Sequence, residues 1–446
     1  MTYPPLRVLI VGAGIGGLAL GQALVAAGGV DVRIAERNPD ADAWLDGYRL
    51  NINPDGARAL HRCLPTPLWE AFVATSPTPP GGISFRTEQL RELFTVTREN
   101  MTGGSTEPAD GQYGVSRRVL RTLLLAGLDD HVRYGAEFRR YTVAGDGTVT
   151  AQFADGTSIT ADVLVGADGA NSAVRRQYLP HAERVPTDAG GIAARLPLDD
   201  DTRVWLPAAL TEGMTLVMPP SGRASMFTSA FPGRDALTAA ISDGVGLDGV
   251  GLDQDQLLDD TDDYVLWSVI ADHRVLPDPD GDPDEGADGH LLRETALDLT
   301  RGWSPDLRRV IADSDPASLG VMRFRHSTLV DPWAATTVTV LGDAVHNMPP
   351  VGGLGANSAL RDAAELAERL LAARDGAPLV PAIAAYEERM RGWGYGAVRE
   401  STANARRATT ANPLARRMGR GYFRVRGALR ARPTTTAATV TTAPRP

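Results

Sequence analysis

Three glycines and an acidic residue near the start of the chain have the spacing of a nucleotide-binding turn. Gly12, Gly14 and Gly17 form a GxGxxG pattern directly after an apolar stretch. In such a turn the second glycine lets the backbone approach a pyrophosphate, and the helix that follows offers free N–H groups and its positive dipole end. Glu36, followed by Arg37, stands where a carboxylate can accept hydrogen bonds from ribose hydroxyls. The pattern therefore predicts a dinucleotide site.

A second segment rich in proline and glycine, VLGDAVHNMPPVGGLGAN, lies far along the chain at residues 340–357. Its aspartate can hydrogen-bond the hydroxyls of a ribityl chain. Its glycines allow backbone N–H groups to face a flat ring, and the helix that follows directs its positive end at that ring. The glycine turn alone fits NAD and FAD equally well, but FAD is long and needs contacts well beyond that turn. The two segments together predict FAD, and they must then share one cleft. The candidate cofactor-binding residues in this segment are Asp343, Pro350, Gly353, Gly355, Ala356 and Asn357.

The elements that must position these residues are those of an α/β fold. Residues 6–11 are expected to form a buried strand, residues 15–27 a helix and residues 30–37 the next strand, which together make a βαβ unit. A further strand within residues 161–179 ends in a loop at Asp168 and leads into a helix. The section that follows contains mostly strand patterns. We therefore expect a Rossmann-like FAD-binding domain interrupted by a mostly β substrate domain, with C-terminal helices.

The same patterns predict a surface for the last helix and the boundaries of the domains. The last predicted helix is rich in arginine and free of acidic residues, so it could contact a membrane or a partner, but the acidic surface of the same chain is the expected docking surface. The FAD-binding domain is expected to comprise residues 1–75, 104–180 and 290–380, and the substrate domain is expected to comprise residues 76–103 and 181–289. The C-terminal helices are expected at residues 381–432, followed by a tail without fixed structure at residues 433–446.

Composition excludes several classes of protein. The 446 residues carry a formal charge of -10, so no bulk positive charge draws the chain to nucleic acid. All 45 basic residues are arginine, which excludes a Schiff-base lysine and the lysine of a P-loop. Cys63 is the one cysteine, which is typical of a cytoplasmic protein. Glycines interrupt the apolar start of the chain, so no membrane span is expected, and the histidines lack metal-ligand spacing.

Three ordered motifs resemble those of a known family. The glycine turn with Glu36, the stretch DVLVGADGANSAVRR and the stretch VLGDAVHNMPPVGGLGANSALRDAAELAERL are similar to the signatures of the class A flavoprotein monooxygenases, which have the para-hydroxybenzoate hydroxylase fold. The resemblance covers residues 6–180 and 320–400 and is weak across 181–290. In chain length the protein is similar to the tetracycline-inactivating and smaller aromatic-ring hydroxylases of that family. Leu354 departs from the family pattern, since many members carry glutamine there.

The resemblance implies roles for individual residues. GVSRRVLRTLLL matches the helix whose leading arginine, here Arg117, reaches the cofactor. GYRLNINPDGARAL matches the loop beside the flavin, which places Arg49 and Asn51 near the ring. Asp168 belongs to the second motif and is a further cofactor-binding candidate. Arg49 is also the candidate for catalytic contact with the flavin or its reductant.

The resemblance also implies an activity. NADPH or NADH would reduce noncovalently bound FAD, O2 would add at C4a of the flavin, and the hydroperoxide would oxygenate a small molecule. Hydroxylation of an aromatic or polyketide-like compound of secondary metabolism is the expected reaction. The cofactor carries this chemistry, so the protein mainly has to hold the substrate and exclude water. Met226, Phe227 and Trp267 are candidates for the substrate pocket, with core packing as the alternative.

Two other functions stay open at this point. An FAD-dependent reductase or dehydrogenase would bind the same cofactor without inserting oxygen. A non-catalytic flavoprotein would dock a partner through the arginine-rich C-terminal helix. A tryptophan-type flavin halogenase is excluded, because it needs a lysine to relay hypohalous acid and the chain has none.

Overall fold

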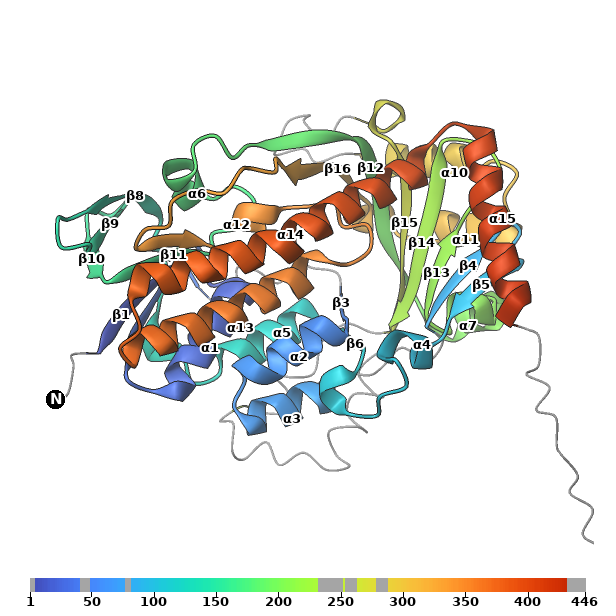
Figure 1. Cartoon of the computed structure of the whole chain (residues 1–446). Coiled ribbons are helices and arrows are strands. Elements are labelled where there is room, and N and C mark those ends of the chain that lie inside the picture. Colours follow the sequence, from blue (N-terminus) through green and yellow to red (C-terminus); the bar gives the residue numbers. More distant parts are fainter. Residues whose placement is uncertain are drawn as a thin grey trace, which may run out of the picture.

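The computed structural model describes residues 5–40, 49–76, 82–231, 252, 263–277 and 288–430. The predicted tail at 433–446 lies outside these residues. Figure 1 shows one part built around parallel strands and a second part built around a larger, mainly antiparallel sheet. The long helix α14 (Leu379–Thr409) runs along both parts. The predicted α/β fold with a mostly β second part and C-terminal helices is therefore confirmed.

The parallel sheet has the strand order β17-β11-β1-β2-β7 among the described residues. Its central strand, β1 (Leu6–Val11), pairs in parallel with β11 (Val163–Gly166) and β2 (Val30–Ala35). The edge strands are β17 (Val338–Val340) and β7 (Val132–Arg133). Because these strands all run in one direction, their carboxyl ends meet at one edge of the sheet, which is where ligands bind in such folds.

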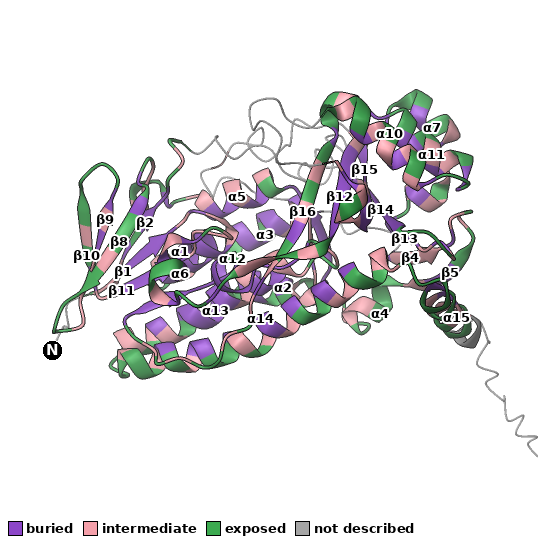
Figure 2. Ribbon diagram, turned by 90° about the horizontal axis from the view of Figure 1, so that it is seen from above, coloured by how far each residue is buried: buried purple, intermediate pink, exposed green. Residues whose placement is uncertain are grey.

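Helices cover this sheet and complete its core. Helix α1 (Ile15–Ala27) packs against α13 (Gly355–Arg374), so two segments far apart in the sequence lie side by side. Most residues of β1 and α1 are buried, as the purple parts of their ribbons in Figure 2 show. The other elements of this part are α2 (Pro54–Cys63), α3 (Thr66–Thr75), α5 (Arg117–Leu125), α6 (Ala173–Tyr178), α12 (Asp343–His346), β3 (Leu50–Ile52), β6 (Tyr113–Val115), β8 (Phe138–Val143), β9 (Val149–Phe153) and β10 (Ser158–Ala161).

The second sheet has the order β16-β12-β15-β14-β13-β4-β5. Neighbouring strands are antiparallel except β4 and β13, which are parallel. One face is covered by the helices α10 and α11, whose apolar residues share a core with the strands. The elements of this part are β4 (Ile83–Arg86), β5 (Glu92–Val96), α4 (Arg98–Thr102), β12 (Arg184–Pro197), α7 (Asp200–Trp205), β13 (Met214–Val217), β14 (Ala224–Phe231), β15 (Tyr264–Asp272), α10 (Gly289–Leu299), α11 (Pro305–Ala312), β16 (Gly320–Ser327) and α15 (Pro413–Arg430).

The chain returns to the parallel-sheet part later than the predicted boundary at residue 290. Leu307 and Val310 of α11 are fully buried in the core of the second sheet, and β16 is an edge strand of that sheet. The chain rejoins the parallel sheet only at β17. An amphipathic helix pattern does not indicate which of two sheets its apolar face will cover, so the predicted domain division at residue 290 stays a prediction. Within the described ranges, no helix combines the length and apolar character that a membrane crossing requires.

Candidate active site

A cavity of about 2330 Å³ connects the two segments that the sequence predicts to share a cleft. Gly12, Gly14 and Glu36 border it at one end, and residues 349–356 border it further along. The prediction that the glycine turn and the proline-bearing loop share one cleft is therefore confirmed. A pocket for one drug-sized ligand has a volume of roughly 300–1,000 Å³, so this cavity is large enough for a long cofactor together with a second molecule.

The glycine turn has the shape that a phosphate group requires. Gly12 has a φ of +109°, a conformation that favours glycine, and a side chain there would collide with the backbone of Ala167. A side chain at Gly17 would collide with the carbonyl of Gly12. At Gly14, by contrast, an added Cβ would have no heavy atom within 4 Å, so the backbone opens directly onto the cavity. The turn is thus closed on the protein side and open where an anion would meet the N-terminus of α1.

Glu36 is fixed beside this turn by backbone hydrogen bonds. Its Oε2 accepts from the N–H of Ala13 at 2.8 Å, and its Oε1 accepts from the N–H of Asn38 at 2.9 Å. The residue is only 4% exposed but borders the cavity, as does the exposed Arg37. The carboxylate therefore has one fixed position at the carboxyl end of β2, suited to hydroxyl groups of a ligand.

Asp168 holds the start of α6 as well as bordering the cavity. Its Oδ2 accepts from the N–H groups of Ala173 at 2.7 Å and Val174 at 3.1 Å, and its other oxygen accepts from the hydroxyl of Ser172. Ser172 is itself the N-cap of the helix, and its Oγ accepts from the N–H of Arg175. Asp168 thus has a structural role at the cavity wall, and cofactor binding by this residue stays a prediction.

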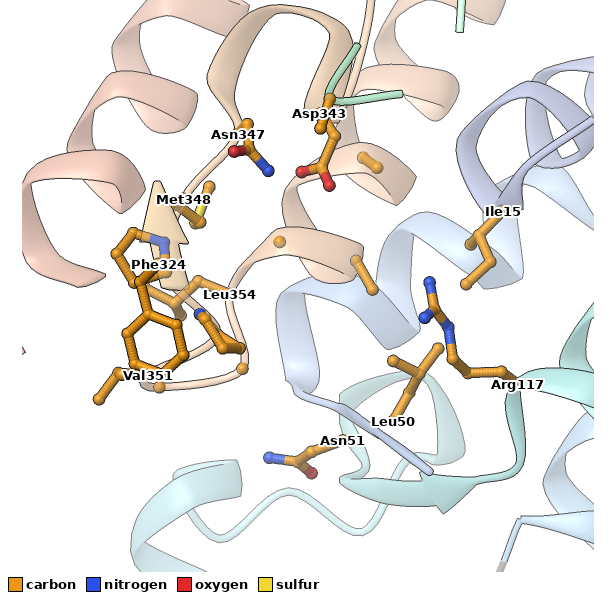
Figure 3. Close-up of a pocket in the computed structure, with 18 of the residues that line it drawn as sticks. Ile15, Leu50, Asn51, Arg117, Phe324, Asp343, Asn347, Met348, Val351 and Leu354 are labelled. Carbon is orange, nitrogen blue, oxygen red and sulfur yellow. The ribbon is translucent and has the colours of Figure 1, made fainter. Parts of the chain in front are cut away.

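Asp343 and Arg117 are directed into the pocket from different elements, as Figure 3 shows. Desolvation raises the pKa of Asp343 above its usual range, although His346, Asn347 and Arg117 oppose that shift. Desolvation also lowers the pKa of Arg117, with Asp343 opposing it. Each charge therefore partly compensates the other across the cavity. A neutral Asp343 can donate a hydrogen bond and an ionised one can only accept, so either form can bind a hydroxyl group.

A buried network holds the turn before Asp343 from behind. Nε2 of His346 lies 2.6 Å from Oδ2 of Asp362, and neither side chain is exposed. The same Oδ2 accepts from the N–H of Gly342 at 2.8 Å, and Oδ1 accepts from Nε1 of Trp393 at 2.8 Å. The turn is therefore tied to α13 and α14. The sequence analysis missed Asp362 and Trp393, because both lie within helix patterns and their partners are distant in the sequence.

The loop at residues 349–355 is held by side chains from two helices. Nδ2 of Asn357 donates to the carbonyls of Gly353 at 2.7 Å and Asn51 at 2.9 Å. The hydroxyl of Ser401 in α14 meets the carbonyls of Pro349 and Val351, the latter at 3.1 Å. The sequence contains no signal for Ser401, which lies in the middle of a helix.

The first turn of α13 faces this loop without a side-chain cap. Leu354 is at the N-cap, and its apolar side chain cannot accept a hydrogen bond from the N–H groups of the first turn, which contains no acidic residue. Gly355 and Ala356 border the cavity. Free N–H groups at a helix N-terminus attract negative charge, so this helix end fits a flat ring that becomes anionic on reduction. Phe324, Met348 and Leu354 lie together at one side of the loop in Figure 3.

Arg49 and Asn51 also border the cavity, near different partners. The guanidinium carbon of Arg49 lies 5.5 Å from the ring centroid of Phe231 and 5.9 Å from that of Tyr264, within the range of a cation–π contact. Oδ1 of Asn51 accepts from Nε2 of Gln112 at 3.0 Å. The roles predicted for Arg49 and Asn51 are compatible with these positions and stay predictions.

Of the three residues expected in the substrate pocket, Phe227 has its side chain on the cavity face of the sheet. It pairs with Ser268 on β15, which also borders the cavity. Trp267 lies on the opposite face, fully buried, and its Nε1 donates to Oγ of Ser314 at 2.8 Å. The pocket interpretation of Trp267 was therefore wrong. Met226 touches the cavity boundary but is fully buried in the same core as Trp267.

The sequence analysis did not single out most residues of the apolar half of the cavity. They come from strands of the second sheet and from α15. This helix packs through Phe423 on Phe85 of β4 and Phe94 of β5, and its Arg420 forms an ion pair with Glu88 in the turn between those strands. Apolar character alone does not distinguish them from core residues. They include Phe85, Leu216, Leu266, Ile270, Met418 and Tyr422.

Comparisons with known proteins agree with this geometry. The family model of an FAD binding domain matches residues 288–401. A solved structure from Photorhabdus luminescens, described as an FAD-containing monooxygenase, is 32% identical, covers 91% of this chain and 98% of its own, and superposes with a TM-score of 0.77. A salicylate hydroxylase with bound substrate has a TM-score of 0.70 at 19% identity and supports the fold alone.

Named relatives extend the comparison to sequence. A dual O-methyltransferase/FAD-dependent monooxygenase of Cercospora beticola is 33% identical over 86% of this chain. The chain spans only 44% of the length of that relative. The 3-amino-4-hydroxybenzoate 2-monooxygenase of Streptomyces platensis is 27% identical over 87% of this chain and 84% of its own length.

Proposed function

Because the chain belongs to the class A FAD-dependent monooxygenases, we propose that it binds FAD noncovalently and oxygenates an aromatic or polyketide-like small molecule. NADPH or NADH is the proposed electron donor and O2 the oxygen source. The observation that carries this proposal is the continuous cavity from the glycine turn at Gly14 to the loop before α13. A cofactor as long as FAD has contacts at both ends of such a cavity and leaves the apolar half for a substrate.

The residues along the cavity fit the successive parts of FAD. Glu36 would accept hydrogen bonds from the adenosine ribose, and the open backbone at Gly14 with the N-terminus of α1 would hold the pyrophosphate. Asp343 would hydrogen-bond the ribityl hydroxyls. The loop held by Asn357 and the N-terminus of α13 would hold the isoalloxazine ring.

When bound, FAD supplies the two-electron chemistry that activates O2 for transfer of one oxygen atom. The chain's own residues would orient the substrate, exclude water and stabilise negative charge on the ring through the N-terminus of α13. Apolar side chains such as Phe227 and Phe324 would pack on a flat substrate. Hydroxylation is the proposed reaction, because an electron-rich aromatic ring needs little help from a catalytic side chain.

Cofactor retention gives the first experiment. Purified protein is expected to be yellow, and heat denaturation is expected to release FAD. Glu36→Ala and Asp343→Ala are each expected to weaken FAD binding by about tenfold or more, a loss comparable with one hydrogen bond to a charged group. The matched control is Asp298→Ala on α10, whose carboxylate is exposed, does not border the cavity and forms an ion pair with Arg301. Equal FAD retention in all three variants would contradict the cofactor assignment.

Isotope labelling gives the second experiment. Labelled O2 is expected to appear as one oxygen atom in the product of an aromatic substrate that stimulates NAD(P)H consumption. Substrate turnover without incorporation of label would instead support the reductase or dehydrogenase alternative. FAD binding without stimulated consumption by any member of a broad aromatic panel would favour a non-catalytic flavoprotein.

A further inference from the structure

A buried arginine lies at the corner of the cavity where α14 ends and α15 begins. Arg416 borders the cavity and is only 6% exposed. Its Nε donates to the carbonyl of Thr410 at 2.6 Å, and its Nη2 donates to the carbonyl of Ala408 at 2.9 Å. Its Nη1 donates to Oγ of Ser225 on β14 at 3.3 Å. The guanidinium is thus fixed between two helices and the cavity face of the second sheet.

The three acceptors named above, two carbonyl oxygens and one hydroxyl oxygen, are neutral. Among the residues that the structure describes, no carboxylate lies within 4.0 Å of its guanidinium, although Glu400 on α14 also borders the cavity. Arg420, one turn further along α15, does have such a partner, since its Nη1 lies 2.8 Å from Oε2 of Glu88. A buried charge without a counter-ion is costly, so the difference between these two arginines requires an explanation.

Capping of α14 explains only part of this arrangement. The carbonyls of Ala408 and Thr410 belong to the C-terminal end of that helix, whose dipole is equivalent to about half a negative charge. A guanidinium has five N–H donors, of which the bonds above use three. Nη1 and Nη2 therefore each keep one hydrogen. Burial lowers the pKa of Arg416 to about 10, which leaves it positively charged at neutral pH.

The surroundings of Arg416 fit an organic anion. Arg407 borders the same cavity, and its Nη1 donates to the neutral Oδ1 of Asn404 at 2.9 Å. Phe227 and Ile270 on the sheet and Tyr422 on α15 provide apolar cavity wall. A charge-assisted hydrogen bond is stronger in an apolar cavity than in water, and the two nitrogens of a guanidinium match the two oxygens of a carboxylate.

We propose that Arg416 binds a carboxylate on the aromatic substrate, at the end of the molecule remote from the flavin loop. This inference rests on the proposed function, because it places the substrate in the apolar half of the same cavity. It narrows the substrate class to aromatic acids. It also assigns to α15 a role in substrate selection, since Arg416 is contributed by that helix.

Matched acid and amide ligands test this assignment. The probes are benzoate, 2-naphthoate and anthraquinone-2-carboxylate, each with its carboxamide, titrated calorimetrically into the FAD-loaded protein without reductant. The unaltered protein is expected to bind at least one acid about tenfold or more tightly than its amide, as expected for a charged pair in an apolar cavity. Arg416→Gln is expected to lose that preference while its affinity for the amide stays within about twofold, since glutamine removes the charge that pairs with a carboxylate and a neutral amide does not depend on that charge.

Arg420→Gln is the matched control, because it removes an arginine of the same helix that already has a carboxylate partner. It is expected to keep the preference for the acid. The proposal is overturned if the unaltered protein binds acids and amides equally, if it binds no acid in the series, or if Arg416→Gln weakens both ligands alike. FAD absorbance and retention are measured on the same samples, so loss of the cofactor, which would sink the proposed function, is distinguished from loss of acid recognition.

Discussion

Buried acidic side chains hold the backbone turns that face the cofactor cavity. Glu36 accepts from the N–H of Ala13, and Asp362 accepts from the N–H of Gly342. The position of Glu36 after a glycine turn predicted its importance. Asp362 carried no such signal, because within the helix pattern of residues 355–374 it is one polar residue among several. Its role depends on His346, which only the folded chain brings within 2.6 Å.

The pairing of His346 with Asp362 predicts a pH-dependent stability. Burial alone lowers the pKa of His346, but the charge of Asp362 and the hydrogen bond to it outweigh burial and raise the pKa above 6.5. Charged His346 therefore stabilises the folded state fully below pH 6.5. This contribution to stability is lost as the pH rises through the raised pKa of His346. Asp362→Asn is expected to destabilise the protein more at pH 6 than at pH 9, because the variant loses the carboxylate that stabilises the charged imidazole. Urea denaturation at the two pH values measures this difference. An equal loss of stability at both pH values would show that the pair does not titrate between pH 6 and pH 9.

At the scale of elements, α14 supports the loop that faces the flavin ring. Ser401 is fully buried and is the residue of this helix whose hydroxyl meets the carbonyls of Pro349 and Val351. Ser401→Ala removes the single hydroxyl hydrogen that these two carbonyls share, at a cost of about 1–3 kcal/mol. We expect weaker FAD binding by about tenfold, a shifted visible spectrum of the bound flavin, and recovery of both in Ser401→Thr.

A control separates this effect from a general loss of helix stability. Thr295 on α10 also donates its hydroxyl to a backbone carbonyl, that of Leu291 at 2.8 Å, but it is half-buried and does not border the cavity. Thr295→Ala is therefore expected to leave FAD affinity and the flavin spectrum unchanged. An unchanged flavin spectrum in Ser401→Ala would show that the loop does not depend on α14.

Local sequence patterns predicted individual helices and strands better than they predicted which elements pack or pair with one another. The βαβ unit at residues 6–37 and the C-terminal helices expected from residue 381 were recognised, because each carries its own periodicity. The parallel pairing of β4 with β13 was not, since it joins strands separated by more than a hundred residues. Trp267 shows the same difficulty, because strand alternation places it on one face of the sheet without indicating which face. The positions of α10 and α11, encoded later in the chain, decide that its face is the core.

At the scale of the whole molecule, the cofactor cavity depends on segments spread along most of the chain. Gly14, Asp168, Asp343 and Arg416 come from different elements, and each borders the same cavity. A ligand that contacts the segments of Gly14, Asp168 and Asp343 binds only when the folded chain brings these three segments together. Its binding free energy therefore adds to the stability of the folded chain. This link between assembly and binding can be measured without knowledge of the substrate.

FAD is therefore expected to raise the melting temperature of the protein. At a free concentration one hundred times Kd, a ligand that binds only the folded state adds about 2.7 kcal/mol. The unfolding entropy per residue implies that a chain of 446 residues gains roughly 3 °C from this amount. Scanning calorimetry of the FAD-stripped protein with increasing FAD measures the shift. In Glu36→Ala the same FAD concentration is expected to produce a shift smaller by about 1 °C or more, because a tenfold weaker affinity removes about 1.4 kcal/mol. A melting temperature that is independent of FAD would mean that the three segments do not act as one binding site.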